Sequence, residues 1–388
     1  MQFYIFFAYF EQKHKILIRI ILCSMSLKIC VYAIAKNENK FIERWFNSVK
    51  EADYVCVLDT GSTDGSFEKF KELGIITKQK KYSNFRFDIA RNDSLKLVPP
   101  DTDICVCLDL DEVLHAGWSK TIKDNWKSNT TRAKYRYTWN FNPDGSEGVV
   151  FMADKVHKYN YYHWTHPVHE VLTINQNLTE NIIELPNLQV DHHADNSKSR
   201  SNYLPLLELS VKESPNDDRN MHYLGREYMF HREYDKAIET LKQHLTLPTA
   251  TWNLERSASL RYMANCYKQK NEKEKQEKYL YLSCLEAPTS REAYFELGVF
   301  YFENKEFLKS AFFFEEMLKI KSRELNYISS PICWSATPYD YLSLCYYEIG
   351  NYSKALSNVN IALTLSNEQR LKDNKQFFLQ KLKSNNNQ

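Results

Sequence analysis

The chain has 388 residues, of which 43% are hydrophobic, a length and composition typical of a globular protein with two or three domains. Its formal net charge is only +2, so electrostatics favour neither nucleic acid nor a membrane surface, and we expect no nucleic-acid partner. The nine cysteines lack paired Cys-x-x-Cys spacing, which argues against a zinc site and a secreted disulfide scaffold. We therefore expect a reducing, cytoplasmic location.

The first 24 residues differ in pattern from the rest of the chain. Residues 2–10 form an aromatic run, residues 11–15 are charged, and residues 16–23 are apolar but interrupted by Arg19. Both apolar runs are shorter than the roughly 18 to 20 residues that span a bilayer, and the charge follows the first run, unlike the order in a signal peptide. We expect an N-terminal extension over 1–24, which the mature protein either keeps or lacks, with peripheral membrane association as an open alternative.

Residues 28–193 alternate short apolar runs with amphipathic stretches, which predicts an α/β domain over 25–200. Predicted strands lie at 29–35, 54–58, 75–78 and 104–110, and predicted helices at 40–51, 66–73, 87–98 and 118–127. Extended aromatic segments at 135–141 and 149–158 predict that the central sheet is mixed.

From residue 202 the pattern is helical, and a small residue recurs before an aromatic one. The four copies begin at Leu224, Met263, Leu297 and Leu342, and their small residues are Gly225, Ala264, Gly298 and Ser343. A generic helical bundle would not need this spacing four times. We therefore predict an all-α domain of tetratricopeptide-type repeats over 201–388, with an insertion at 327–338.

The segment 59–66, DTGSTDGS, follows the second predicted strand. Ligands of parallel sheets bind beyond the carboxyl ends of the strands, so Asp59 is placed to accept hydrogen bonds from a nucleobase or a ribose. Ser62, Thr63 and Asp64 are suitable N-caps for the next helix. The alternative is a polar turn with a cap and no ligand.

A second acidic segment, DICVCLDLDE at 103–112, ends the fourth predicted strand. Alternation along the strand would put Asp109 and Asp111 on one face, with Glu112 as a supporting group. Neighbouring carboxylates repel each other unless a cation joins them, and their oxygens suit Mg²⁺ or Mn²⁺. The alternative is a solvated acidic loop.

Three other segments offer candidate side chains. Arg91 is a candidate partner for a phosphate or a base, with a surface arginine as the alternative. In WTHPVHE, residues 164–170, Glu170 is the candidate base for an acceptor hydroxyl and His169 is its rival. His192 is a candidate partner of the metal or a diphosphate, with a structural histidine as the alternative.

Together these segments resemble family 2 glycosyltransferases with the GT-A fold, particularly members with C-terminal tetratricopeptide repeats. The resemblance is carried by AKNE at 35–38, VLDTGSTDGS at 57–66, IARN at 89–92, LDLDE at 108–112 and PVHE at 167–170. It implies a Rossmann-like GT-A catalytic domain followed by the all-α repeats.

The resemblance also implies roles for single residues. Ala35, Glu38, Asp59, Arg91 and Asp109 would bind the nucleotide-sugar, Asp111, Asp109 and His192 the metal, and Glu170 and His169 would be catalytic. In this family a glycine is usual shortly after the histidine that matches His192. This chain has Ala194 at that glycine position.

The implied activity is Mn²⁺- or Mg²⁺-dependent transfer of a sugar, with inversion, from a UDP-linked donor to an acceptor hydroxyl or another nucleophile. The repeats would position a protein, peptide or glycan acceptor, or form a homodimer. The alternative is an inactive transferase-like domain that serves with the repeats as an interaction scaffold. A nucleotidyltransferase would need a Gly/Arg-rich phosphate loop after the first strand, and residues 35–38 do not supply one.

Overall fold

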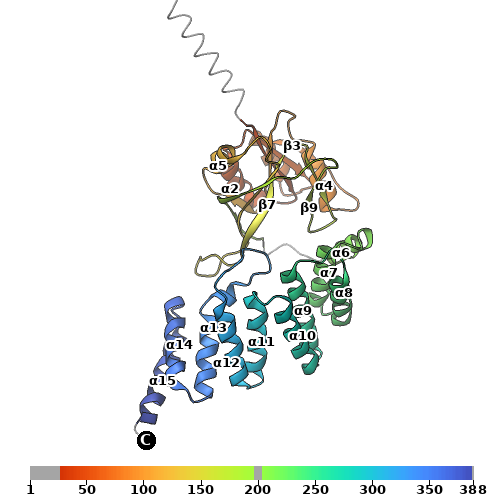
Figure 1. Cartoon of the computed structure of the whole chain (residues 1–388). Helices are drawn as coiled ribbons and strands as arrows, with labels where there is room; N and C mark the ends of the chain where they lie inside the picture. The colour runs from red at the N-terminus through yellow and green to blue at the C-terminus, as the bar shows by residue number, and fades with distance from the viewer. Residues whose placement is uncertain (1–26, 196–202, 387–388) are drawn as a thin grey trace, which may run out of the picture. The chain divides into compact units, whose positions relative to one another are not determined.

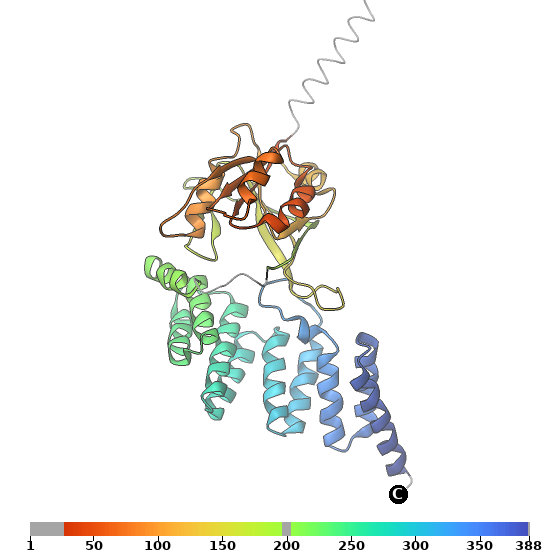
Figure 2. The same ribbon diagram turned by 180° about the vertical axis from the view of Figure 1, so that it is seen from behind.

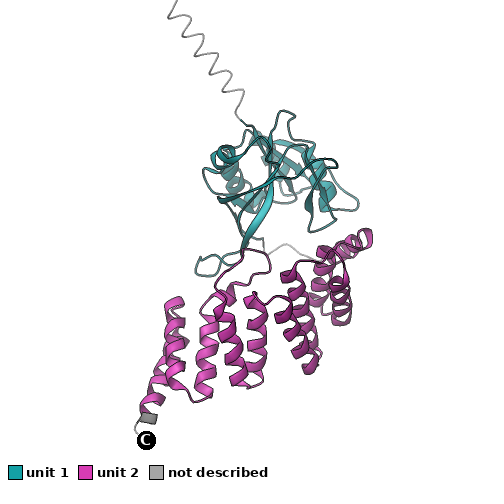
Figure 3. Cartoon of the chain, in the orientation of Figure 1, with its two compact units in different colours: residues 1–198 teal, residues 199–388 magenta. Residues whose placement is uncertain are grey.

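The chain divides into two compact units, residues 1–198 and 199–388 (Figures 1 and 3). The computed structural model describes residues 27–195 and 203–386, so the predicted extension over 1–24 lies outside the described residues. Each helix in these two ranges is too short or too polar to cross a lipid bilayer. The eight cysteines within them are buried free thiols.

A mixed sheet of eight strands forms the centre of the first unit, in the order β3-β2-β1-β4-β7-β6-β10-β5. The strands are β1 (Ile29–Ala35), β2 (Tyr54–Asp59), β3 (Ile76–Gln79), β4 (Ile104–Cys107), β5 (Glu112–Leu114), β6 (Arg132–Thr138), β7 (Val150–Lys158) and β10 (Ile182–His192). Strands β3, β2, β1 and β4 are parallel, whereas β7 runs antiparallel to β4 and β6. This is the mixed Rossmann-like sheet that the sequence predicts.

Helices cover one face of this sheet, and a helix and a hairpin cover the other. Alternate residues of β1 point to opposite faces. Ile29, Val31 and Ala33 pack in the core with α2 (Asn39–Val49), α3 (Ser66–Glu72) and α5 (Trp118–Asn125). Cys30 and Tyr32 pack with a hairpin of β8 (Tyr162–Thr165) and β9 (Val171–Ile174), next to α4 (Phe87–Leu95). Both faces of the sheet are therefore buried, as parallel strands require.

The predicted strand over 104–110 is wrong beyond Cys107. A turn follows, in which the amide of Asp109 donates to Glu112 Oε2 at 2.8 Å and the amide of Glu112 donates to the Asp109 carbonyl at 2.9 Å. The chain then enters β5, which pairs with β10. Leu108 and Leu110 remain buried, so the apolar alternation continues although the strand has ended.

The second unit consists of antiparallel helix pairs, which stand side by side in both views (Figures 1 and 2). The helices are α6 (Tyr203–Glu213), α7 (Asp218–Phe230), α8 (Tyr234–Thr246), α9 (Asn253–Gln269), α10 (Lys273–Glu286), α11 (Arg291–Glu303), α12 (Phe307–Lys319), α13 (Thr337–Glu348), α14 (Tyr352–Leu365) and α15 (Gln369–Asn386). This is a tetratricopeptide-type repeat domain.

The insertion lies between α12 and α13 and includes a short 3₁₀ helix, η1 (Pro331–Trp334). The guanidinium of Arg291 holds the insertion at two points. It donates to the carbonyl of Ile320, just after α12, at 2.9 Å and to the carbonyl of Cys333, in η1, at 3.1 Å. The predicted insertion at 327–338 extends too far, because Pro338 lies in the first turn of α13, where a missing N–H leaves no hydrogen bond unmade.

The small residues lie where paired helices approach closely. A Cβ atom on Gly225 in α7 would lie 2.6 Å from the side chain of Leu241 in α8, and one on Gly298 would lie 3.0 Å from the ring of Phe314. Both separations are too short for carbon atoms in contact. The helices can therefore come this close only because these positions have no side chain.

Gly225→Ala is expected to lower the free energy of unfolding by about 1 to 2 kcal/mol. Overpacking against Leu241 costs about 1 to 3 kcal/mol, and the better helix propensity of alanine offsets part of it. Chemical denaturation of the full chain measures this difference. The matched control is Lys242→Ala on exposed α8 surface, which should be nearly neutral; an equally stable Gly225→Ala chain would contradict the close-contact interpretation.

Candidate functional site

Two of the predicted site residues lie side by side at the carboxyl ends of the parallel strands β1 and β2, next to a residue of β3. Ala35 lies opposite Asp59, and Asp59 lies opposite Gln79. Strand β4 pairs with the other side of β1, so the segment after Cys107 begins near the same edge of the sheet. The two acidic motifs therefore flank the end of β1.

Hydrogen bonds join the loop after β1 to the loop after β2. Backbone amides of one loop meet side chains of the other in Asn37 N to Ser62 Oγ (2.8 Å), Glu38 N to Ser66 Oγ (3.0 Å), Asn39 N to Asp64 Oδ2 (3.0 Å) and Thr63 N to Asn37 Oδ1 (2.8 Å). The N-cap of α3 is Gly65 with φ 85°, not one of the three predicted residues. Asp64 Oδ1 nevertheless accepts from the amide of Ser66, the first residue of α3, at 3.0 Å, while its Oδ2 bonds the amide of Asn39.

Asp59 is fully buried, and its two carboxylate oxygens differ. Oδ1 accepts from the amides of Gly61 and Ser62 and from Gln79 Nε2, each at 2.9 Å. Oδ2 has no hydrogen-bond partner among the residues that the structure describes. A buried carboxylate oxygen is rarely left unmatched, so this one is available to a donor that is not part of the described chain.

Arg91 is 3% exposed and joins two of the predicted site residues. Its Nη1 and Nη2 donate to Asp109 Oδ1 and Oδ2 at 2.6 and 3.0 Å, and its Nε donates to Glu170 Oε1 at 2.7 Å. The guanidinium also lies over the ring of Trp164, 5.3 Å from its centroid. The alternative of a surface arginine is therefore wrong for Arg91.

Lys155 in β7 is a site residue that the sequence analysis missed. Its Nζ lies 3.3 Å from Asp109 Oδ2 and 3.4 Å from Glu112 Oε1, which also accepts from the hydroxyl of Tyr137 at 2.7 Å. Lys155 belongs to no motif and reaches the site only because β7 pairs with β4. The one available signal was a lysine inside a strand with buried neighbours.

These contacts set the charges of the two carboxylates. Burial opposes ionisation of Asp109, but Arg91 and Lys155 outweigh it and hold the pKa of Asp109 well below its usual value. Burial raises the pKa of Glu112, against the effect of Lys155 and with added repulsion from Asp109 and Asp111. Asp109 is therefore a fixed anion at neutral pH.

Asp111 faces His192 instead of Asp109's cations. His192 Nε2 lies 3.3 Å from Asp111 Oδ2, and its Nδ1 lies 2.8 Å from the carbonyl oxygen of Trp139. A carbonyl only accepts, so Nδ1 carries a proton, and a neutral ring then directs the Nε2 lone pair at the carboxylate. Two facing acceptors need a proton or a cation between them.

The surroundings of His192 agree with a metal ligand. Burial disfavours the charged ring, but the hydrogen bond and the charge of Asp111 raise the pKa of His192 above its usual value. The Trp139 ring stacks on the imidazole, with 4.5 Å between centroids. Metal-binding histidines typically donate their second ring N–H to a carbonyl or carboxylate, as Nδ1 does here to the Trp139 carbonyl. Asp111 and His192 therefore fit a divalent cation.

The loop between β8 and β9 carries the two candidate catalytic residues, His169 and Glu170. His166 and His169 have left-handed φ values of 76° and 50°, which are uncommon for residues other than glycine. The carbonyl of Pro167 accepts from the amide of Phe87 at 2.9 Å, which fastens this loop to the start of α4. Both His169 and Glu170 are half-buried.

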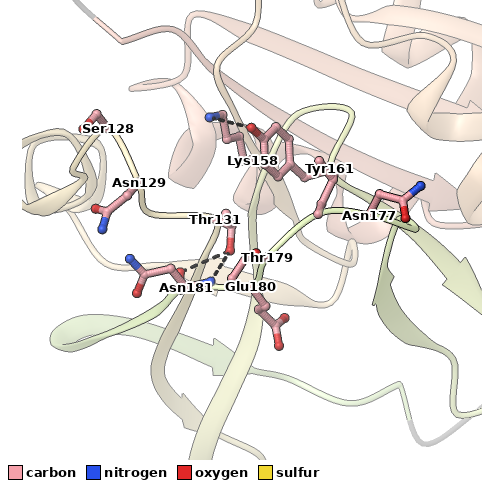
Figure 4. Close-up of a pocket in the computed structure, with 10 residues that line it drawn as sticks. Ser128, Asn129, Thr131, Lys158, Tyr161, Asn177, Thr179, Glu180 and Asn181 are labelled. Carbon is pink, nitrogen blue, oxygen red and sulfur yellow. Dashed lines mark hydrogen bonds between the residues drawn. The ribbon is translucent and has the colours of Figure 1, made fainter.

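A cavity of about 460 Å³ lies at the opposite end of the sheet (Figure 4). Thr131, Lys158 and Asn181, which line it, flank the start of β6, the end of β7 and the start of β10. Lys158 pairs with Ile104 at the first residue of β4, whereas the acidic motif follows the last residue of that strand. This cavity is therefore separate from the motif site.

The structure thus brings some of the predicted residues together directly. Arg91, Asp109 and Glu170 form one contact set, Asp111 and His192 a second, and Ala35, Glu38 and Asp59 lie on the joined loops, with His169 next to Glu170.

Comparisons with known proteins give a family match within the first unit. Residues 30–164 match the family model of Glycosyl transferase family 2, and no curated protein matches the chain. A crystal structure of MamA protein is 21% identical over 42% of this chain and 81% of its own, with a TM-score of 0.34. A tetratricopeptide repeat protein from Parabacteroides merdae is 15% identical over 48% and 68%, with a TM-score of 0.36. Pseudomonas aeruginosa pilF is 11% identical over 45% and 71%, with a TM-score of 0.35. Such low TM-scores carry no argument, so the repeat assignment rests on the helix pairs themselves.

Replacing Arg91 by methionine is expected to lower the free energy of unfolding by about 3 kcal/mol, because it leaves Asp109 and Glu170 without their shared cation. The loss should be smaller at pH 5 than at pH 7, because a buried carboxylate that has lost its cation takes up a proton more readily. In the unaltered chain the Arg91–Asp109 pair contributes fully at both pH values, since the lowered pKa of Asp109 lies below them. Urea denaturation at both pH values measures it.

The control for that experiment is Lys120→Met, whose exposed partner Asp124 lies four residues away in α5. This local pair should contribute at most about 1 kcal/mol. Equal losses in the two variants would contradict the assignment of Arg91 as the cation that joins three segments.

Proposed function

Because residues 30–164 match the family model of Glycosyl transferase family 2, we propose that the first unit transfers a sugar from a nucleotide-linked donor to an acceptor nucleophile. The observation that supports this most is the pair of acidic motifs on either side of β1. One has the unmatched carboxylate oxygen of Asp59, and the other has Asp111 facing His192, a pair that suits a cation. The first would hold the nucleotide and the second its diphosphate.

The nucleotide would lie against the joined loops, beside Ala35, Glu38 and Asp59. Asp59 Oδ2 can only accept a hydrogen bond, so it favours a base with an imide or amide N–H, such as uracil. Cytosine and adenine lack a ring N–H, but their amino groups can donate to a carboxylate as well. A UDP-linked sugar is the proposed donor, and other nucleotides are the competitors that the same chemistry allows.

The metal would be Mn²⁺ or Mg²⁺, held by Asp111 and His192. When bound, such an ion neutralises charge on the diphosphate leaving group. Asp109 already pairs with Arg91 and Lys155, so it serves better as a fixed acceptor for a ribose hydroxyl or a metal-bound water than as a direct ligand. Mn²⁺ suits the imidazole better than Mg²⁺ does.

Glu170 is the proposed base, and His169 its rival. Transfer with inversion needs one group to take the proton of the acceptor hydroxyl. Arg91 holds Glu170 Oε1 at 2.7 Å and so fixes the carboxylate beside Asp109. Glu170→Gln should lower kcat at saturating donor by about 10² or more, with a smaller loss for His169→Ala; the reverse order would assign the base to His169.

The repeats would position a protein, peptide or glycan acceptor or form a homodimer, and sedimentation of the full chain separates these two roles. The free thiols of the described cysteines support the proposed cytoplasmic location.

Asp59→Asn is expected to weaken binding of a uridine diphosphate sugar by about 10- to 100-fold, because the amide replaces a charged acceptor with a weaker one. Isothermal titration with Mn²⁺ present measures this affinity. Asp124→Asn on exposed α5 surface is the matched control and should bind like the unaltered chain. Unchanged binding in Asp59→Asn would remove this residue from the nucleotide site.

Asp111→Asn and His192→Ala should each abolish Mn²⁺-dependent hydrolysis of the donor. The melting temperature should stay nearly unchanged in Asp111→Asn and fall in His192→Ala, which deletes a buried, stacked ring. Release of the nucleoside diphosphate from a panel of nucleotide sugars, with Mn²⁺ or with chelator, is the measurement. Asp124→Asn should keep full turnover. An unaltered chain that binds the donor but never releases its diphosphate would favour the scaffold alternative, and one that binds no nucleotide sugar would overturn the proposal.

A further inference from the structure

A second cluster of metal-ligating side chains lies inside the repeat domain. Asp218 at the start of α7, His244 near the end of α8 and Glu255 at the start of α9 each offer one ligand atom, and these atoms lie within 4.8 Å of one another. His244 is completely buried and Glu255 is 3% exposed. The cluster therefore lies at the junction of three helices, with His244 and Glu255 buried and Asp218 half-exposed.

Two buried imidazole nitrogens in this cluster lack hydrogen bonds. Nε2 of His244 lies 3.4 Å from Glu255 Oε1 but makes no hydrogen bond, and Nε2 of His222 likewise has no partner in the part of the chain that the structure describes. The neighbouring interface of α7, α8 and α9 is filled by apolar side chains. Unmatched nitrogens in such a core need an explanation.

Ser259 holds the other nitrogen of both rings. Its Oγ lies 2.8 Å from His222 Nδ1 and 3.0 Å from His244 Nδ1. One hydroxyl proton can serve only one ring, so the other ring donates to Oγ. If His244 is that donor, its Nε2 carries a lone pair directed at Glu255, which is the arrangement of a metal-binding histidine with its second nitrogen fixed.

Other side chains border the cluster. Tyr327 from the insertion donates its hydroxyl to the second oxygen of Glu255, which fixes this carboxylate. Of the nearby arginines, Arg261 pairs with Glu296 at 2.6 Å, whereas the charge of Arg219 acts on Glu255.

We propose that Asp218, His244 and Glu255 bind a zinc ion, or another divalent transition metal, that fastens the starts of α7 and α9 to the end of α8. One imidazole and two carboxylates form a donor set that zinc accepts. Ligand atoms about 2.1 Å from a tetrahedral ion lie about 3.4 Å apart. The separation of His244 Nε2 and Glu255 Oε1 equals this distance. This structural site is independent of the proposed transferase activity.

The test uses the untagged full chain, dialysed against EDTA and then exposed to ZnCl₂. Elemental analysis gives the zinc content per chain, and thermal unfolding gives the melting temperature. Asp111→Asn is the matched control, because it removes a ligand of the other candidate metal site. We expect the unaltered chain and Asp111→Asn to retain one zinc ion in this site and to melt about 5 °C or more higher with zinc in hundredfold excess over Kd.

Asp218→Asn and His244→Asn should lose both the bound zinc and the rise in melting temperature. The proposal is overturned if the unaltered chain takes up no zinc, if Asp111→Asn removes all the bound zinc, or if folded Asp218→Asn binds zinc as before. Should His244→Asn not fold, Asp218→Asn decides, because its half-exposed side chain lies in the first turn of α7 beside the N-cap Asp217. If neither folds, zinc uptake by the first two proteins decides.

Discussion

The first unit depends on the ion pairs that the buried guanidinium of Arg91 makes with two carboxylates. The guanidinium comes from α4, but its partners lie on two other segments, Asp109 in the turn after β4 and Glu170 in the loop between β8 and β9. A cation this deeply buried is tolerated only when anions match it closely. The helix, the turn and the hairpin must therefore dock together. One side chain, Arg91, joins these three segments at the edge of the sheet.

Charge balance links this clamp to the proposed chemistry. Arg91 and Lys155 supply two positive charges, which face the carboxylates of Asp109, Glu170 and Glu112. Asp111 adds a further negative charge close by, paired with His192. Arg91 and Lys155 are already matched by these carboxylates and cannot neutralise a diphosphate as well. A divalent cation at Asp111 would supply that positive charge, which is the physical reason for the metal dependence proposed above.

Local sequence patterns predicted what depends on neighbours along the chain. Strand β1 is found with the predicted bounds, and the small-residue spacing located the close helix contacts at Gly225 and Gly298. The end of β4 was missed because Leu108 stays buried after the strand stops. Lys155 and the partners of Arg91 could not be predicted, since antiparallel pairing of β7 and docking of the hairpin decide them. These are contacts between segments far apart in sequence.

The joined loops after β1 and β2 have a consequence for evolution and for engineering. A glycine- and serine-rich stretch such as 59–66 reads as a flexible linker that would accept insertions, yet its amides and side chains are committed to the neighbouring loop. One added residue would shift every later bond out of step. Variation in length should therefore spare this loop. If the loop binds a nucleotide, little conformational entropy is lost in ordering it, because its hydrogen bonds already hold it.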